Sequence, residues 1–460
     1  MEGAGLGSID IIAREATLFA AIWFLVGGLD DLAVDLVYIA RRIRAWLRAE
    51  TMAALPETIP EGRIAIFVAC WMEAAVIEQM LRTALERFDH PDYRLYVGTY
   101  PNDRDTIDRV AEVAEADSRV RLVIGPNPGP TTKADCLNVL WRALLRDEAA
   151  EGPVAAVMLH DAEDLVHAQE LRIVAHAIGA YAAVQLPVLP LPDPRSPLVA
   201  GHYCDEFAEA HAKQLPVRQA LGAALPLAGV GCAIRRDMLA RIAERRGGLP
   251  FDEASLTEDY ELGLTVAAMG GRTLFARVAE VPGGRPVSVR AYFPARFDAA
   301  VRQKGRWMTG IALAGWDRTG WGAPGALSDH WMRMRDRRVT LSMPVLAIAY
   351  LALVLWGCSL AGHALTGFAP PPLHPAVRAL LFANLSLLGW RVAVRVAFVW
   401  RAYGWRQAGW APVRMVVANA IALLAARRAV FAYVRMLAGG VPHWDKTEHH
   451  FPDDPGRAAA

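Results

Sequence analysis

Acidic side chains gather in two short stretches of this chain, HDAED at residues 160–164 and TED at residues 257–259. The first follows the apolar run PVAAVML, so Asp161 and Glu163 alternate along one extended edge where a predicted strand ends. Carboxylates crowded in this way repel one another unless a cation is bound. Mg²⁺ or Mn²⁺, held by carboxylates and substrate phosphates, suits such a site. The alternative is an ordinary acid that caps the next helix.

The TED stretch begins a second helical pattern, with Glu258 and Asp259 in its first turn. A carboxylate in this place can act as a general base that takes a proton from an incoming hydroxyl group. The alternative is that both acids only complement the positive end of the helix dipole.

Cationic groups and one tryptophan could complete a site for a sugar phosphate. Lys133 follows the turn GPTT and begins a predicted helix, where free backbone N–H groups and a lysine suit a diphosphate. In FDAAVRQKGRWMTGI, a helix would place Gln303 and Arg306 on one face, with Trp307 one turn from Gln303. Donors beside a flat ring suit an anionic group joined to a sugar. The alternatives are a solvated lysine and a helix end with a packed tryptophan.

Strands and helices alternate through the middle of the chain, residues 60–330. The predicted strands are RIAIFVACW, YRLYVGTY, RVRLVIG and PVAAVMLHD, and a segment with helical periodicity follows each of the first three. This order predicts an α/β domain with a doubly wound parallel sheet. Ligands bind beyond the carboxyl ends of such strands, which directs attention to Glu73, to Tyr100–Asp105 and to HDAED.

The composition indicates a soluble domain joined to membrane helices, because 54% of the residues are hydrophobic, 21% are charged and the mean hydropathy is +0.21. We predict three membrane spans, at 16–40, 339–362 and 376–400. Arginines follow the first span, precede the second and follow the third, so the N-terminus is predicted outside, the loop 363–375 outside and the large domain in the cytoplasm.

Segment 411–438 is apolar but carries Arg414, Arg427, Arg428 and Arg435, which a helix lying in the membrane interface tolerates better than a spanning one. An interfacial helix keeps the C-terminus cytoplasmic, and a fourth crossing is the alternative. The predicted organisation is a membrane helix and basic flank at 1–50, a catalytic domain at 60–330, two membrane helices at 339–400, an interfacial helix at 411–438 and a tail at 439–460.

Several classes of function are disfavoured. The net charge of +1 gives no general attraction to nucleic acid. The five cysteines form no CxxC pair, so we expect free thiols in a reducing compartment, without disulfides or structural zinc. A phosphoryl-transfer enzyme of the P-loop type would need a GxxxxGK[ST] loop, which the chain lacks.

The ordered set ACWME, KADCLN, HDAED, TED and QKGRW, followed by membrane helices, resembles the processive, membrane-integrated family 2 glycosyltransferases. This resemblance implies a GT-A (Rossmann-like) domain in the cytoplasm, transmembrane helices at both ends and a bacterial inner-membrane location. It implies inverting transfer of a sugar from a nucleotide-diphospho-sugar to a growing glycan that is extended and exported. We expect the donor to be linked to UDP. The implied cofactor is Mg²⁺ or Mn²⁺.

The same resemblance implies a role for each matching residue. Asp259 is the base, with Glu258 and Asp161 beside it, and Asp161 and Glu163 hold the metal. The donor diphosphate is bound by Glu73, Lys133, Gln303 and Arg306, and the acceptor by Trp307. The small residues Gly229 and Gly231 let the acceptor approach the backbone, or else form a plain turn.

A closer resemblance is to the NfrB-type inner-membrane glycosyltransferases, a group associated with phage adsorption and surface glycan. The stretches that carry it are GLDDLAVDLVY, YVGTYPND, HDAEDLVH, HYCDEFAEAH, FDAAVRQKGRWMTGI and HWDKTEHHFP. It implies an outer-membrane export partner. The tail follows the predicted interfacial helix and carries a ring, a cation and donors, so together with this resemblance we expect it to close over the site as a gate through Trp444, Lys446, Thr447 and His449. The alternative is a disordered end, which we expect for Pro452 to Ala460.

Three features depart from the family pattern. Thr99 and Tyr100 stand where many members have paired aspartates that contact the nucleotide base, and the usual D-x-D reads Asp161-Ala162-Glu163. The chain ends at Ala460, so we expect no cyclic-dinucleotide-sensing domain after the membrane part. Two rival functions remain open, a transferase of single sugars to a polyprenyl phosphate and a non-catalytic scaffold of an export or phage-receptor assembly.

Overall fold

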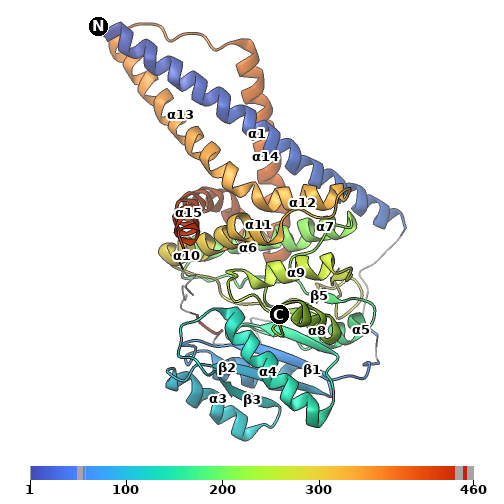
Figure 1. Ribbon diagram of the computed structural model, residues 1–460. Helices are drawn as coiled ribbons and strands as arrows, with labels where there is room; N and C mark the ends of the chain where they lie inside the picture. Colours follow the sequence, from blue (N-terminus) through green and yellow to red (C-terminus); the bar gives the residue numbers. More distant parts are fainter. Residues whose placement is uncertain (1, 49–54, 57, 441–448, 453–460) are drawn as a thin grey trace.

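The computed structural model describes residues 2–48, 55, 56, 58–440 and 449–452. It has a sheet with helices on both faces and long helices that extend away from one end of this domain (Figure 1). Between them lies a layer of shorter helices, and the active-site candidates lie where this layer meets the sheet.

The sheet has seven strands in the order β3-β2-β1-β4-β6-β5-β7. Their bounds are β1 Ile64–Ala69, β2 Tyr93–Thr99, β3 Val120–Ile124, β4 Ala156–His160, β5 Ala183–Gln185, β6 Cys232–Arg235 and β7 Thr273–Phe275. The first four strands pair in parallel, as predicted. The prediction of a wholly parallel sheet is wrong, because β6 runs antiparallel to both β4 and β5.

The path of the chain between β5 and β6 explains this reversal. A parallel crossover would return the chain to the amino ends of the strands. Here the chain leaves β5 and forms α6 (Val199–Glu209), the π-helix η1 (Ala210–Gln214) and α7 (Leu215–Ala220), which lie in the layer next to the long helices (Figure 1). It therefore re-enters the sheet at the carboxyl end of β4 and must run backwards.

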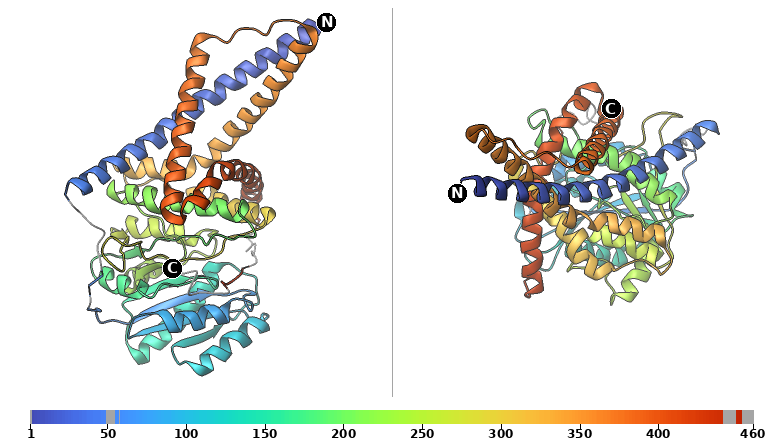
Figure 2. Two further views of the ribbon diagram at one scale, coloured as in Figure 1. Left: turned by 180° about the vertical axis from the view of Figure 1, so that it is seen from behind. Right: turned by 90° about the horizontal axis from the view of Figure 1, so that it is seen from above.

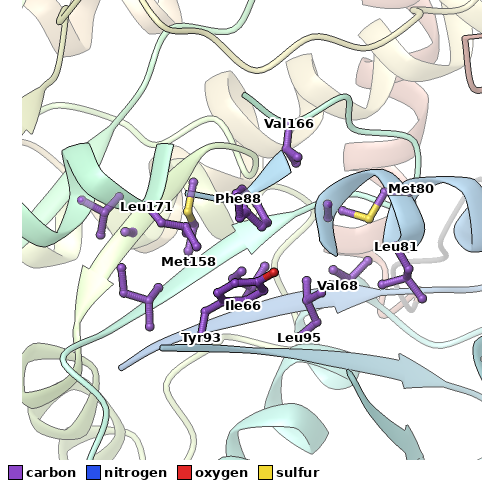
Figure 3. Close-up of a cluster of buried hydrophobic side chains, with 14 of the residues drawn as sticks. Ile66, Val68, Met80, Leu81, Phe88, Tyr93, Leu95, Met158, Val166 and Leu171 are labelled. Carbon is purple, nitrogen blue, oxygen red and sulfur yellow. The ribbon is translucent and has the colours of Figure 1, made fainter. Parts of the chain in front are cut away.

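Both faces of the sheet are buried, which is why its strands are continuous apolar runs. Along β1, Ile64, Ile66 and Val68 point into one core, whereas Ala65 and Phe67 point into the other. Figure 3 shows the first of these cores. Its helices are α2 Ile77–Arg87, α3 Arg104–Ala116 and α5 Glu170–Ile178, and the second core is covered by α4 Lys133–Glu151, α8 Arg236–Arg245 and α9 Glu258–Ala268.

The layer between the sheet and the long helices also contains elements from later in the chain. They are α10 Phe297–Met308, the π-helix η2 Thr309–Leu313, α11 Ala314–Thr319 and α12 Leu327–Arg337. The predicted helix that carries QKGRW is therefore confirmed as α10. It lies beside α15 (Trp405–Leu437), the last long helix (Figure 1).

Four helices in the described part of the chain are long and apolar enough to cross a membrane. They are α1 Glu2–Leu47, α13 Val339–Thr366, α14 Pro375–Tyr403 and α15. The predicted spans lie within the first three. In both side views α1 and α13 run together, while α15 lies across the direction of α13 and α14 (Figures 1 and 2).

The three aspartates that interrupt the first span are all paired. Asp30 and Asp31 form ion pairs with Arg335 and Arg338, at the junction of α12 and α13. Asp35 accepts hydrogen bonds from Lys213 of η1 and from the indole of Trp390. Charges within an apolar helix are tolerated when they face protein partners, so these acids connect α1 to the domain.

Helix α15 is attached to the same layer through a buried charge. Arg414 donates to Asp205 of α6 at 2.9 Å and to the carbonyl oxygen of Pro197 at 2.7 Å. Arg414 thus faces protein and not lipid. The interfacial location of 411–438 remains a prediction that this packing supports.

Candidate active site

A cavity of about 480 Å³ lies between the carboxyl ends of the strands and the layer of shorter helices. It collects side chains from stretches that are far apart in the sequence. The expected site residues that line this cavity are Glu73, Lys133, Asp161, Glu163, Glu258, Asp259, Gln303, Arg306, Trp307 and His449. The rule that ligands bind beyond the carboxyl ends of parallel strands therefore located the cavity correctly.

The acidic turn after β4 is held from behind by a buried charge cluster. Asp164 accepts hydrogen bonds from the backbone N–H of Asp161 at 3.0 Å and from Nδ1 of His160 at 2.8 Å. Nε2 of His160 lies 3.1 Å from Glu170. Burial lowers the pKa of His160, but Asp164 and Glu170 outweigh it and raise that pKa to about 10. Asp164 thus orients the turn and leaves Asp161 and Glu163 to face the cavity.

We predict that replacing His160 with leucine destabilises the domain, because Asp164 and Glu170 would remain buried without their cation. Removing one partner of a buried ion pair costs about 3–5 kcal/mol of unfolding free energy. Chemical or thermal unfolding of the whole protein in detergent would measure this. His90→Leu is the control, since His90 is buried and forms no ion pair with the described residues. Equal losses for the two variants would contradict the prediction.

Lys133 crosses the cavity to the acidic turn. It begins α4, whose N-cap Thr132 accepts a hydrogen bond from the backbone N–H of Asp135. Its ammonium group donates to Asp161 and lies 3.4 Å from the carbonyl oxygen of Gly229. Burial alone would lower the pKa of Lys133, but the carboxylates of Asp161 and Glu258 raise it. Lys133 is therefore a permanent positive charge and not a solvated surface lysine.

Asp259 lies in the first turn of α9, where burial and the neighbouring carboxylate of Glu258 raise its pKa to about 7. The pKa of Glu258 is also raised, mainly by burial. A carboxyl group with a pKa near neutrality is suited to accept a proton at physiological pH. If Glu258 and Asp259 only complemented the helix dipole, we would expect both side chains to be exposed and their pKa values to be unshifted.

The two glycines expected to admit the acceptor both adopt positive φ and lie against other parts of the protein. Gly229 has φ of +74° and a Cβ there would lie 2.7 Å from Oδ2 of Asp259. Gly231 has φ of +57° and a Cβ there would collide with Val289. The space beside each glycine is filled by protein. This supports the alternative of a turn, which at Gly229 also lets the catalytic candidate Asp259 approach the backbone.

The QKGRW helix presents both kinds of group that its sequence predicted. Gln303, Arg306 and Trp307 all line the cavity. Oε1 of Gln303 is buried and has no hydrogen-bond partner among the residues that the structure describes, and a buried polar atom without a partner is costly unless a ligand completes it. The ring of Trp307 packs edge-on against Tyr203, with centroids 6.0 Å apart. This packing holds the ring at the cavity wall.

The end of the tail reaches the cavity from the other side. Nδ1 of His449 lies 3.0 Å from Glu73 and 3.2 Å from Glu163. Phe451 is buried in the first core, and Pro452 is also buried. The expectation that Pro452 belongs to a disordered end is therefore wrong. Trp444, Lys446 and Thr447 lie outside the described residues.

A family model described as "Glycosyltransferase like family 2" matches residues 60–310. The chain belongs to this family. The match covers the sheet, the cavity and the QKGRW helix, which is the region where the ordered motifs lie. The expected GT-A glycosyltransferase domain with membrane helices at both ends is confirmed.

Two curated relatives come from Escherichia coli. They are bacteriophage adsorption protein B of strain K12 and bacteriophage N4 adsorption protein B of O157:H7, each 35% identical over 471 residues that include 95% of this chain. The chain spans 62% of the length of these relatives. A similar solved structure is the mannosyltransferase PcManGT from Pyrobaculum calidifontis in complex with GDP-Man and Mn²⁺, at 18% identity and a TM-score of 0.51, covering 93% of this chain and 99% of that one.

The carboxylates of this family 2 site are of the ligand type that a divalent cation prefers. Carboxylates of Asp161, Glu163 and Glu73 converge with the imidazole of His449, and hard cations prefer oxygen ligands. Burial raises the pKa of Glu163 to about 8. Among the described residues, no group of three or more His, Cys, Asp or Glu side chains is arranged to hold a metal ion. Lys133 and His449 supply the positive charge in this structure.

Asp103, the next acid along the chain, does not compensate for the departure at Thr99 and Tyr100. Asp103 follows them, but its carboxylate accepts hydrogen bonds from the backbone N–H groups of Met72 and Thr106. Tyr100 instead packs edge-on against Trp71, with ring centroids 5.2 Å apart. A threonine and a packed tyrosine thus stand where many family members have paired aspartates.

Sequence reasoning missed the residues that support the catalytic candidates. Met72 has φ of +56°, a strained value for a residue other than glycine, and its N–H bond to Asp103 fixes the backbone that presents Glu73. On the other side, Tyr260 donates to Asp336 of α12 at 2.7 Å, and Asp336 accepts two bonds from Arg218. Neither set has a local sequence signal, because its members meet only in the folded chain.

Proposed function

We propose that this chain is an inverting glycosyltransferase that moves a sugar from a nucleotide diphosphate to a hydroxyl group of a growing surface or secreted glycan. One observation carries the proposal. A single cavity joins a base with a pKa near 7 to a cluster of cations and carboxylates suited to a diphosphate. We place the domain on the cytoplasmic side of a bacterial inner membrane.

The donor would bind with its diphosphate between Lys133 and Arg306. Both line the cavity, and preorganised cations in a partly buried site stabilise negative charge on a leaving group. Gln303 offers its amide oxygen, which has no hydrogen-bond partner among the described residues, to a hydroxyl group of the donor sugar. No acid takes the place of the aspartates that contact the base in many family members, so the assignment of UDP stays an expectation.

A divalent cation, when bound, would neutralise charge on the departing nucleoside diphosphate. Asp161 and Glu163 are the residues proposed to hold it. His449 lies within 3.2 Å of Glu163 and is a candidate third ligand. An imidazole ligand would favour Mn²⁺ over Mg²⁺, since magnesium prefers oxygen.

Asp259 would remove the proton from the acceptor hydroxyl as that oxygen attacks the sugar. The indole of Trp307 would supply a flat face for the terminal acceptor sugar. From this point the cavity continues to Met332, Arg335 and Arg338, next to the start of α13. An acceptor could therefore approach from the membrane side, as extension and export of a polymer require.

The membrane-side end of the cavity is also compatible with one rival function. Arg218, Arg335 and Arg338 line the membrane-side end of the cavity, and guanidinium groups bind phosphate well. A polyprenyl phosphate would fit this end as the acceptor of a single sugar. We favour a glycan acceptor because these arginines are already paired with Asp336, Asp30 and Asp31.

The test is nucleotide release by the purified protein in detergent, with a panel of nucleotide sugars and either Mg²⁺ or Mn²⁺. Product size separates the two functions, since a polymer and a single lipid-linked sugar differ in mass and in extraction by organic solvent. Release of nucleotide from no member of the panel, with acceptor oligosaccharides and polyprenyl phosphate both supplied, would count against catalysis.

We predict a cytoplasmic C-terminus, because the arginines along α15 suit a helix in the interface and Arg414 is bonded to the catalytic domain. A reporter that is active only in the cytoplasm, fused after Ala460, should be active. The matched control is the same reporter inserted in the loop 363–375, which should be inactive. A periplasmic signal at the C-terminus would mean a fourth crossing.

We predict that the tail completes the site, since His449 reaches Glu73 and Glu163 and Phe451 anchors it in the core. His449→Ala should raise the Mn²⁺ concentration needed for half-maximal activity and should lower nucleotide release. Trp444→Ala and Lys446→Ala should lower release more than stability, as a closing gate requires. Deletion of 453–460 serves as the control and should change nothing. Full activity after truncation at Pro442 would remove the tail from the mechanism.

A further inference from the structure

The catalytic candidate Asp259 is held by the residue that follows it in α9. The backbone N–H of Tyr260 donates to Oδ1 of Asp259 at 2.8 Å. A Cβ at Gly229 would lie 2.7 Å from Oδ2, so the carboxylate has little room on that side. The position of the base therefore depends on where the first turn of α9 is held.

The side chain of Tyr260 joins this turn to α12. Tyr260 is 5% exposed, and its hydroxyl group donates to Asp336 at 2.7 Å. Burial and the negative charge of Asp336 raise the pKa of this hydroxyl group, so it stays protonated and remains a donor. Asp336 is fixed in turn, because Nη1 of Arg218 lies 2.8 Å from each of its carboxylate oxygens. The first turn of α9 thus takes its position from α12.

Helix α12 is also joined to the first membrane helix, α1. Arg335 and Arg338, at the end of α12, each form ion pairs with both Asp30 and Asp31 of α1. These four side chains, which we call the α1 clasp, are between 12% and 27% exposed. Side chains three positions apart share a helix face, whereas Asp336 lies about 100° around the helix from Arg335. Helix α12 therefore contacts α1 through one face and α9 through another, as its place in the layer of shorter helices allows (Figure 1).

We propose that Tyr260 and Asp336 are positioning residues for the base Asp259, and that the α1 clasp sets their position through α12. This rests on the proposed function. Tyr260, Asp336 and both arginines of the clasp line the cavity, so this chain of contacts runs along its membrane-side wall. A base acts only at the correct distance from the hydroxyl group that it deprotonates. The first membrane helix thus contributes to catalysis without contacting the reacting atoms.

The groups expected to bind the donor belong to other elements. Lys133 begins α4 and Arg306 lies on α10. A general structural defect would weaken donor binding and stability together. Loss of positioning should instead lower the turnover number and leave the KM for the donor unchanged, because the interaction that is lost acts only in the transition state.

The test uses the full-length protein in detergent and two small substitutions. Tyr260→Phe removes only the hydroxyl group. Asp31→Asn weakens the α1 clasp but leaves Asp30 paired with both arginines. The turnover number, the donor KM of nucleotide release and thermal unfolding are measured for each variant and for the double variant. Amide hydrogen exchange in the first turn of α9 is measured without donor, so that the link from α1 to α9 is tested even if the proposed catalysis fails.

Each substitution has a matched control. Tyr96→Phe removes a similar hydroxyl group, because Tyr96 is 2% exposed and donates to Asp147 at 2.9 Å. Tyr96 is not among the residues that line the cavity. Asp10→Asn is the control on α1, since Asp10 accepts a hydrogen bond from Ser359 of α13 at 2.6 Å. It lies about 30 Å along the helix from Asp30.

Tyr260→Phe should lower the turnover number by about 10–100-fold, since a misplacement of about 1 Å costs up to this much. Asp31→Asn should cause a smaller loss of the same kind, and both should speed exchange in the first turn of α9. The double variant should lose less than the product of the two single losses, because both substitutions interrupt one chain of contacts. The two controls should leave turnover and this exchange unchanged.

Three results would overturn the proposal. An unchanged turnover number in Tyr260→Phe, or an equal fall in Tyr96→Phe, would remove the positioning role. Losses that multiply in the double variant would separate α1 from the base. Unchanged exchange in both variants would exclude the link whatever the protein does with nucleotide sugars. Faster exchange in a protein that releases no nucleotide would support the link and count against the proposed function alone.

Discussion

Replacing Asp259 with asparagine should lower the turnover number by about 10²–10⁴-fold, the usual contribution of a general base. The amide has nearly the same shape but cannot accept the acceptor's proton. Stability should not fall, because the change removes a buried carboxylate that Glu258 repels. Nucleotide release measured beside thermal unfolding would separate the two effects. The exposed acid Glu244, replaced by glutamine, is the control and should leave both unchanged.

The pH dependence gives a second measurement of the same prediction. The base works only when ionised, so the turnover number should rise with pH through an apparent pKa of about 7. The negative charge of Glu258 helps to raise the pKa of Asp259. Glu258→Gln should therefore shift the rising limb to lower pH, whatever it does to the maximal rate. A limb that stays in place in this variant would exclude Asp259 as the titrating group.

Asp161→Asn should nearly abolish nucleotide release that depends on a divalent cation. The change removes a proposed metal ligand and also the anion that Lys133 contacts. Loss of one charged group that stabilises the transition state costs about 10²–10³-fold in turnover. The fold should persist, because Asp164 and not Asp161 accepts the hydrogen bonds that hold the turn.

Binding of Mn²⁺, followed by electron paramagnetic resonance in the absence of donor, supplies a readout that does not depend on turnover. Wild type should bind Mn²⁺ in the presence of nucleoside diphosphate. Asp161→Asn should bind Mn²⁺ at least about tenfold more weakly, because one ligand interaction is lost. Asp105→Asn on the exposed start of α3 is a suitable control. Full wild-type activity in the presence of a chelator would contradict the role of the metal.

The secondary structure around each motif could be predicted from the sequence, because it depends on residues that are neighbours along the chain. The apolar runs of β1 and β4 and the periodicity of α4 and α10 follow from side-chain spacing, and these elements formed where predicted. Each motif therefore lay at the end of the element expected, with HDAED after β4 and Lys133 at the start of α4. Those positions were sufficient to locate the cavity.

The roles of single residues could not be predicted when they depended on which residues they contact in the folded chain. Gly229 and Gly231 were identified as special positions, but their neighbours Asp259 and Val289 could not be known from the sequence. Asp164 stands in the same HDAED stretch as the expected metal ligands, yet its partners are His160 and the backbone of Asp161. A residue's type limits its chemistry, while its contacts select among the remaining possibilities.

The sequence by itself determined the family, the order of strands and helices, the apolar spans and the motif residues of the cavity, because spacing and composition act over a few residues. The tertiary structure alone decided the reversed direction of β6, the approach of His449 to Glu73 and the pairing of Asp35 with Lys213. Each of these joins segments that are far apart along the chain. Such contacts depend on the path of the backbone in space, which burial of the whole apolar surface selects and no local pattern encodes.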